Sequence, residues 1–185
     1  MKTNILFSVL LASAALAASL ASAPASAQNL GQGFIRNVSY NKCLDFAAGD
    51  LSNTVTLQLH GCQGNAAIHQ QWNFIPAGSY PNNAPSYLFQ NAMNYTCAAV
   101  ENDSLSNAAK IVQRPCDANN PSQHWIQTAN GVLNTQTRWM NGRSAKCLDA
   151  WTNANGVVLQ QYNCASSSNW PQQGFKNELF PIGGP

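Results

Sequence analysis

Charged residues are scarce in this chain of 185 residues. They make up 9% of the sequence, with nine Lys and Arg against seven Asp and Glu, and the basic residues never form a run. Because a nucleic-acid partner requires a basic patch, this composition argues against nucleic-acid binding. The plentiful Asn, Gln, Ser and Thr give a polar surface without charge, which suits a neutral, hydroxyl-rich ligand.

Patterns typical of metal sites and of helices are also missing. No two cysteines are separated by only two residues, and His60, His69 and His124 show no metal-ligand spacing to a cysteine cluster. We therefore expect neither a metal nor another cofactor. Beyond the N-terminal segment, no stretch sustains the apolar period of an amphipathic helix. Short alternating stretches separated by Asn, Gly, Ser and Pro instead predict an all-β protein.

The N-terminal segment has the pattern of a secretory signal peptide. A lysine precedes an apolar run over residues 5–20, and Ala25 and Ala27 have the spacing that signal peptidase prefers. No basic stop-transfer flank follows the run, which argues against a membrane anchor. We expect residues 1–27 to be a signal peptide and residues 28–185 to form one secreted domain that does not insert into a membrane.

Six cysteines in a secreted chain indicate disulfides. They fall into three pairs whose members are 19, 19 and 17 residues apart, and the pairs recur about every fifty residues. Six cysteines allow fifteen pairings, but a unit that folds the same way three times favours pairing within each repeat. The favoured disulfides are Cys43–Cys62, Cys97–Cys116 and Cys147–Cys164.

A Gln-x-Trp motif follows the same period. The third copy has Phe in place of Trp, because Trp170 lies too close to the preceding cysteine and is assigned to the loop before it. The copies are Gln70 with Trp72, Gln123 with Trp125, and Gln173 with Phe175. We expect the rings in the core and the glutamine amides on nearby backbone groups. Four short strands in each repeat predict a threefold pseudosymmetric barrel, with repeats over about residues 34–76, 86–128 and 136–180.

These motifs resemble those of the ricin-B-type lectins and family-13 carbohydrate-binding modules. KCLD, LQLHGC and HQQW carry the resemblance, which covers about residues 34–180. It implies a β-trefoil in which each repeat can hold one shallow sugar site. In that family an aspartate of Cys-Leu-Asp accepts hydrogen bonds from sugar hydroxyls, and an aromatic ring two residues before the trailing cysteine stacks on the sugar. A polar residue just before Gln-x-Trp adds a hydrogen bond.

The resemblance implies two complete sites. They comprise Asp45, His60 and His69 in the first repeat, and Asp149, Tyr162 and Gln172 in the third. The corresponding residues of the second repeat are Ala99, Arg114 and Ser122, so we expect its site to be degenerate. A carboxylate forms charge-assisted hydrogen bonds, and a ring covers the apolar face of a sugar. We rank the third site first because tyrosine stacks better than histidine. Trp151 and Trp170 are further candidates for stacking, and Trp151 equally for packing.

The sequence therefore predicts a secreted lectin that binds neutral glycans and is not an enzyme. Glycoside hydrolysis needs two carboxylates about 5 to 10 Å apart, whereas Asp45 and Asp149 occupy equivalent places in different repeats. One alternative is a protein-binding trefoil, such as a protease inhibitor or a secreted effector. Its candidate loop is Pro76 to Ser86, for which a plain linker is the favoured interpretation. Another alternative is a non-catalytic subunit that targets a glycoside hydrolase partner.

Overall fold

The computed structural model describes residues 30–46, 55–80, 84–128, 137–166 and 171–181. The regular secondary structure of this part of the chain consists of strands and short 3₁₀ helices. The strands are β1 (Gly31–Asn37), β2 (Lys42–Phe46), β3 (Leu57–Gly61), β4 (Gln71–Tyr80), β5 (Ala84–Asn91), β6 (Thr96–Val100), β7 (Ile111–Pro115), β8 (Trp125–Thr128), β9 (Arg138–Asn141), β10 (Cys147–Asp149), β11 (Val157–Val158), β12 (Gln160–Tyr162) and β13 (Phe175–Leu179). The 3₁₀ helices are η1 (Ile68–Gln70), η3 (Glu101–Asp103) and η4 (Pro121–Gln123).

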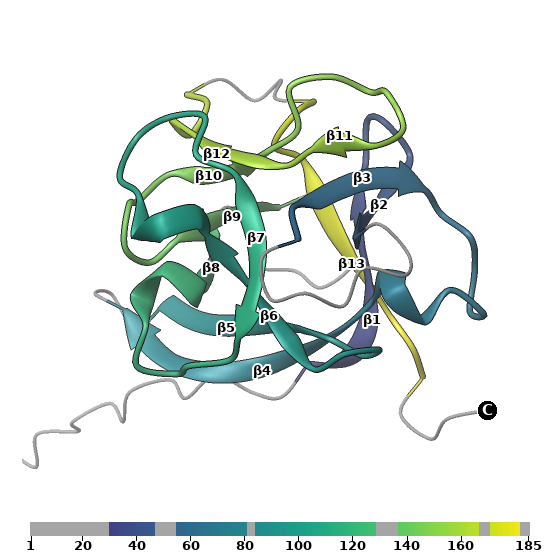
Figure 1. The fold of residues 1–185 in the computed structure, drawn as a ribbon, viewed down its shortest axis with the longest axis horizontal. Coiled ribbons are helices and arrows are strands. Elements are labelled where there is room, and N and C mark those ends of the chain that lie inside the picture. The colour runs from purple at the N-terminus through teal and green to yellow at the C-terminus, as the bar shows by residue number, and fades with distance from the viewer. Residues whose placement is uncertain (1–29, 47–54, 81–83, 129–136, 167–170, 182–185) are drawn as a thin grey trace, which may run out of the picture.

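Six of the strands form a closed barrel. β1 pairs with β4, β4 with β5, β5 with β8, and β8 with β9, all antiparallel. The circle closes at β13, which pairs with β1 and is bridged to Thr137, the residue before β9. In Figure 1 the yellow β13 accordingly returns to the purple β1. A closed barrel leaves no exposed edge among these strands.

Three hairpins complete the fold, one from each repeat. They are β2 with β3, β6 with β7, and β10 with β12. Neighbouring hairpins touch: Thr56 is bridged to Val112 and Lys110 to Gln160, while β11 pairs with β3. A six-stranded barrel with three linked hairpins is a β-trefoil, which confirms the fold class predicted from the sequence.

The Gln-x-Trp motifs start the same kind of strand in all three repeats. Trp72 lies opposite Asn91, Trp125 opposite Asn141, and Phe175 opposite Asn37. Phe175 therefore occupies the place of the third tryptophan. The three rings are fully buried, and the indole nitrogens of Trp72 and Trp125 donate to the backbone oxygens of Leu44 and Ala98, each at 3.1 Å.

Aromatic rings fill the centre of the barrel. Trp139 is fully buried, with its ring 4.8 Å from that of Phe89 in an edge-to-face contact and 6.2 Å from that of Phe74. Phe89 in turn stacks on Trp125 at 5.6 Å. The three repeats thus share one core, so the hairpins are held on a common rigid base.

The three disulfides pair as the repeat predicts. They are Cys43–Cys62, Cys97–Cys116 and Cys147–Cys164. In each bond the first cysteine lies within the first strand of a hairpin, and the second cysteine follows the second strand. The first and third disulfides therefore tie the strands that carry the two predicted sugar sites, and the second ties the strands of the repeat whose site is predicted to be degenerate.

The segment Pro76 to Ser86 differs from its predicted role as a plain linker. Its described residues, 76–80 and 84–86, extend β4 and β5 as paired strands, with Tyr80 opposite Ala84 and a register shift between Pro76 and Ser79. The hydroxyl of Tyr80 lies 3.1 Å from the ring Nδ1 of His124, so this hairpin packs against the second repeat. Turn-forming residues suggested a loop, but barrel pairing overrides that local preference.

The predicted signal peptide lies within residues 1–29, outside the described part of the chain. It and its cleavage site stay predictions. Within the described residues, no helix has the length and apolar character needed to cross a membrane.

Candidate functional site

The hairpin register brings the predicted site residues onto one face. In the first repeat Asp45 lies opposite Gln58, and Cys43 lies opposite His60. Opposed and alternate residues of an antiparallel pair share a face, so Asp45, Gln58 and His60 point to the same side. The third repeat repeats this arrangement with Asp149 opposite Gln160 and Cys147 opposite Tyr162.

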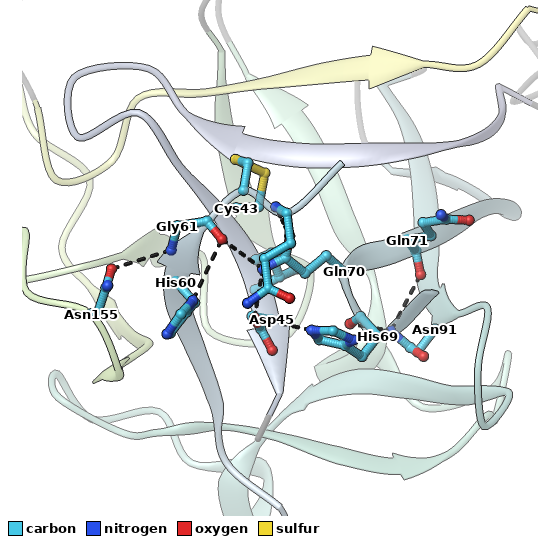
Figure 2. Close-up of polar contacts among 12 residues, drawn as sticks. Cys43, Asp45, His60, Gly61, His69, Gln70, Gln71, Asn91 and Asn155 are labelled. Carbon is cyan, nitrogen blue, oxygen red and sulfur yellow. Dashed lines mark hydrogen bonds and ion pairs between the residues drawn. A yellow bond between two sulfur atoms is a disulfide. The ribbon is translucent and has the colours of Figure 1, made fainter. Parts of the chain in front are cut away.

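Asp45 lies at the floor of a small pocket. The pocket has a volume of about 110 Å³ and is lined by Asp45, Gln58, His60, Gln63 and His69. Asp45 Oδ2 accepts a hydrogen bond from Gln70 Nε2 at 2.7 Å, and His69 Nε2 lies 3.7 Å from the same oxygen. Figure 2 shows the carboxylate between these two side chains, with His60 on the neighbouring strand. The first repeat therefore brings its three predicted residues together.

The second carboxylate oxygen of Asp45 lacks a partner. Asp45 Oδ1 is buried and receives no hydrogen bond of ordinary geometry from the described residues, although the Gln58 amide on the opposite strand lies close enough to lower the pKa of the carboxyl. A buried acceptor without a donor carries a desolvation penalty, which a ligand hydroxyl would relieve. Burial raises the pKa of Asp45, against the opposing effects of the Gln70 hydrogen bond, His69, His60 and Gln58.

This raised pKa has a consequence for stability. Because the folded pKa exceeds the unfolded one, the stabilising contribution of protonated Asp45 is fully present below the unfolded value of about 3.9 and is lost as the pH rises through the folded pKa. Ionisation of Asp45 as the pH rises through its folded pKa therefore costs stability.

Asp45→Asn keeps the shape and the bond from Gln70 but removes the buried charge. We expect it to raise the free energy of unfolding at pH 7 by about 1 kcal/mol, or the midpoint by roughly 2–4 °C. The gain should vanish near pH 3, where both side chains are neutral. Thermal unfolding of the oxidised protein at the two pH values measures this. A lower midpoint at pH 7 would show that the ionised carboxylate is well compensated.

Asp149 is held by two amides. Gln160 Nε2 donates to Oδ1 at 2.9 Å, and Gln173 Nε2 donates to Oδ2 at 3.1 Å. The ring of Tyr162, on the opposite strand of the hairpin, is 45% exposed. Gln172 is exposed, and its backbone oxygen accepts from the Ala150 nitrogen at 3.0 Å.

Two further aromatics were predicted near the third site. Trp151 is 63% exposed, which favours its role as a contact surface over packing. Trp170 lies outside the described residues.

Each site borrows contacts from another repeat. Asn155, from the third repeat, accepts hydrogen bonds from Gly61 N at 3.2 Å and from Lys42 Nζ at 2.5 Å beside the first site (Figure 2). Tyr40, from the first repeat, lies near Asp149. Burial raises the pKa of the Tyr40 hydroxyl, and the charge of Asp149 raises it further. Residues of the first and third repeats thus lie at the edge of each other's predicted site.

The structure adds Gln58 and Gln160 to the predicted residues. Both precede the trailing cysteine by four positions, and the second repeat has Val112 there. The glutamine is therefore present in the two repeats that have the aspartate and absent from the repeat that lacks it. This correlation can be seen in the sequence alone. Both aspartates also lie deeper than a shallow site implies, since Asp45 is 2% and Asp149 5% exposed. The glutamine amides and neighbouring rings cover them.

One protein family matches the chain. The model of the ricin-type beta-trefoil lectin domain matches residues 31–173. No curated protein sequence matches.

Solved structures share the fold. The designed threefold-symmetric protein ThreeFoil is 19% identical with a TM-score of 0.68, covering 80% of this chain and 97% of ThreeFoil. An exo-beta-1,3-galactanase from Clostridium thermocellum is 19% identical with a TM-score of 0.69, covering 82% of this chain and 31% of the galactanase. The Polyporus squamosus lectin, bound to Neu5Aca2-6Galb1-4GlcNAc, is 13% identical with a TM-score of 0.66, covering 83% of this chain and 50% of the lectin. This chain therefore spans half or less of the length of the latter two.

Proposed function

Because the chain belongs to the ricin-type beta-trefoil lectin domain family, we propose that it is a secreted lectin that binds neutral glycans and catalyses no reaction on them. The observation that carries the proposal is the repeated aspartate, buried on a hairpin face, held by the Gln-x-Trp glutamine and placed beside a ring. The three disulfides suit an extracellular compartment.

The first and third repeats supply the proposed contacts. At the third site Asp149 accepts hydrogen bonds from sugar hydroxyls, and Tyr162 covers the apolar C–H face of the ring. At the first site Asp45 Oδ1, which lacks a donor, is the acceptor, while His60 stacks and His69 lies on the rim. Gln172 is an additional hydrogen-bonding group at the third site.

The surroundings of Asp45 support binding over hydrolysis. The pocket around this carboxylate is lined by amides and imidazoles, without a second carboxylate among its described residues. A glycosidase needs an acid and a base or nucleophile on either side of one bond. A neutral hydroxyl-rich ligand also agrees with the low charge of the whole chain, 9% of its residues.

A glycan array probed with the oxidised chain tests the proposal. We expect binding to neutral glycans that a simple sugar competes away, with a dissociation constant for one site on the order of 0.1–1 mM. Two sites on one rigid domain raise the apparent affinity for a dense surface. Reduced and denatured protein is the control for non-specific adhesion. Absence of sugar-competable binding across the array would refute the lectin proposal and favour a protein partner.

A further inference from the structure

The second repeat has a pocket of its own. Its volume is about 610 Å³, and it lies between the β6–β7 hairpin, η3 and η4. The lining includes Ala99, Asn102, Asp103, Arg114, Asn120 and Gln123. This is the place where the first and third repeats hold their aspartates, since Ala99 lies opposite Val112 as Asp45 lies opposite Gln58.

Loss of the aspartate leaves a hydrogen-bond donor unused. Gln70 Nε2 and Gln173 Nε2 each donate both to a backbone oxygen and to a carboxylate. Gln123 Nε2 donates to the backbone oxygen of Pro115 at 3.0 Å, and Ala99 offers no carboxylate for its second N–H. Gln123 is only 2% exposed and lines the pocket, so a ligand in the pocket can accept from this N–H.

The pocket nevertheless contains a carboxylate, supplied by Asp103 and not by the position that Ala99 occupies. Asp103, four residues after Ala99, accepts hydrogen bonds at Oδ1 from Ser122 Oγ and, at 3.2 Å, from Asn120 Nδ2. Ser122 occupies the position that His69 has in the first repeat, where His69 contacts Asp45. Both hydrogen bonds use Oδ1, which leaves Oδ2 of Asp103 to accept from a ligand.

The short helix η3, which carries Asp103, is held in place. Asn102 and Asp103 both have a φ of 53°, a left-handed conformation that Asn and Asp tolerate best. Arg143, from the third repeat, donates through Nε to the backbone oxygen of Asp103 at 3.0 Å. The hydrogen bonds from Ser122 and Asn120, together with Arg143 and Arg114, lower the pKa of Asp103, so it is ionised at neutral pH.

We propose that this pocket is a third carbohydrate site, in which Asp103 accepts hydrogen bonds from sugar hydroxyls and Arg114 and Gln123 donate to sugar oxygens. The inference rests on the proposed lectin function and goes beyond it, because the site uses none of the three family contacts. The ligand is a neutral saccharide. The two negative charges of Asp103 and Asp117 balance the two positive charges of Arg114 and Arg143, so an acidic sugar gains no net attraction. Arg114 replaces the stacking ring, so recognition here is polar.

The experiment isolates this pocket with the double variant Asp45→Asn/Asp149→Asn. Side-chain NMR signals of Arg114 Nε–H and the Gln123 amide are followed while galactose, N-acetylgalactosamine, xylobiose or mannobiose is added into the millimolar range. We expect saturable shifts with at least one of these sugars. Adding Asp103→Asn or Arg114→Gln should weaken that binding at least about tenfold, because each removes a charge-assisted hydrogen bond. Glu101→Gln is the matched control, since Glu101 belongs to η3 but does not line the pocket.

The outcomes separate the two proposals. If the unaltered protein binds a sugar but the double variant shows no shift at Arg114 or Gln123, the lectin proposal stands and the third site is refuted. Shifts that survive both Asp103→Asn and Arg114→Gln also refute it. Tighter binding of glucuronic acid than of every neutral sugar would overturn the neutral specificity. If the unaltered protein binds no sugar at all, both proposals fail.

Discussion

Asp149→Asn is expected to weaken glycan binding by about 10- to 100-fold, more than Asp45→Asn does. The two side chains have the same shape, and Asn Oδ1 can still accept the hydrogen bond that Gln173 gives to Asp149. Gln160, which is only partly buried, can turn its amide to accept from the new Asn Nδ2. The hairpin therefore keeps its structure, and what is lost is the charge-assisted bond to sugar hydroxyls, worth about 1.5–3 kcal/mol.

The larger effect at Asp149 follows from its aromatic neighbour. Tyr162 exposes 45% of its surface beside the carboxylate, whereas the first site offers the smaller ring of His60. Titration calorimetry with the sugar selected by the glycan array measures both variants. Glu101→Gln, which neutralises a carboxylate outside all three sites, should bind like the unaltered protein. Unchanged affinity in Asp149→Asn would show that Asp149 is a structural residue and not a sugar acceptor.

The repeat pattern alone was sufficient to predict the fold. Cysteine pairs and Gln-x-Trp motifs at a common period predicted a threefold barrel, because both motifs occupy fixed places in each repeat. The cysteines join the two strands of a hairpin, and the ring of Gln-x-Trp is buried in the core. The substitution of Phe175 for the third tryptophan was also recognisable, since its spacing from Cys164 was kept while that of Trp170 was not.

Contacts between repeats could not be predicted from the sequence. Asn155 reaches the first site and Tyr40 the third because neighbouring hairpins touch in the trefoil, and no local pattern encodes that proximity. The burial of Asp45 and Asp149 depends in the same way on side chains packed over them.

The second repeat shows a related limit of predicting sites by comparing equivalent positions of the repeats. Its aspartate position holds Ala99, so a comparison by position indicates a lost site. The carboxylate of Asp103 lines the same pocket from η3, which only the three-dimensional arrangement reveals. Pattern matching by position therefore detects the family contacts but not a replacement from elsewhere in the chain.

Trp125→Ala is expected to have the largest effect on stability, a loss of about 3–5 kcal/mol in the free energy of unfolding. Trp125 is fully buried and stacks on Phe89 at 5.6 Å, and its Nε1 donates to the backbone oxygen of Ala98. The substitution leaves a cavity in the core that all three repeats share, together with an unpaired carbonyl. Since typical domains are stable by about 5–15 kcal/mol, the whole trefoil is weakened and not the second repeat alone.

Trp125→Phe separates the two contributions. It keeps an aromatic ring, as the third repeat does natively with Phe175, but removes the donor to Ala98. We expect an intermediate loss, because the smaller ring and the missing hydrogen bond together cost less than removal of the ring. Denaturant unfolding with the disulfides intact measures both variants, and Tyr95→Ala, at a tyrosine that is 67% exposed, is the control. If Trp125→Ala were as stable as Tyr95→Ala, the buried Gln-x-Trp ring would not contribute to the stability of the core.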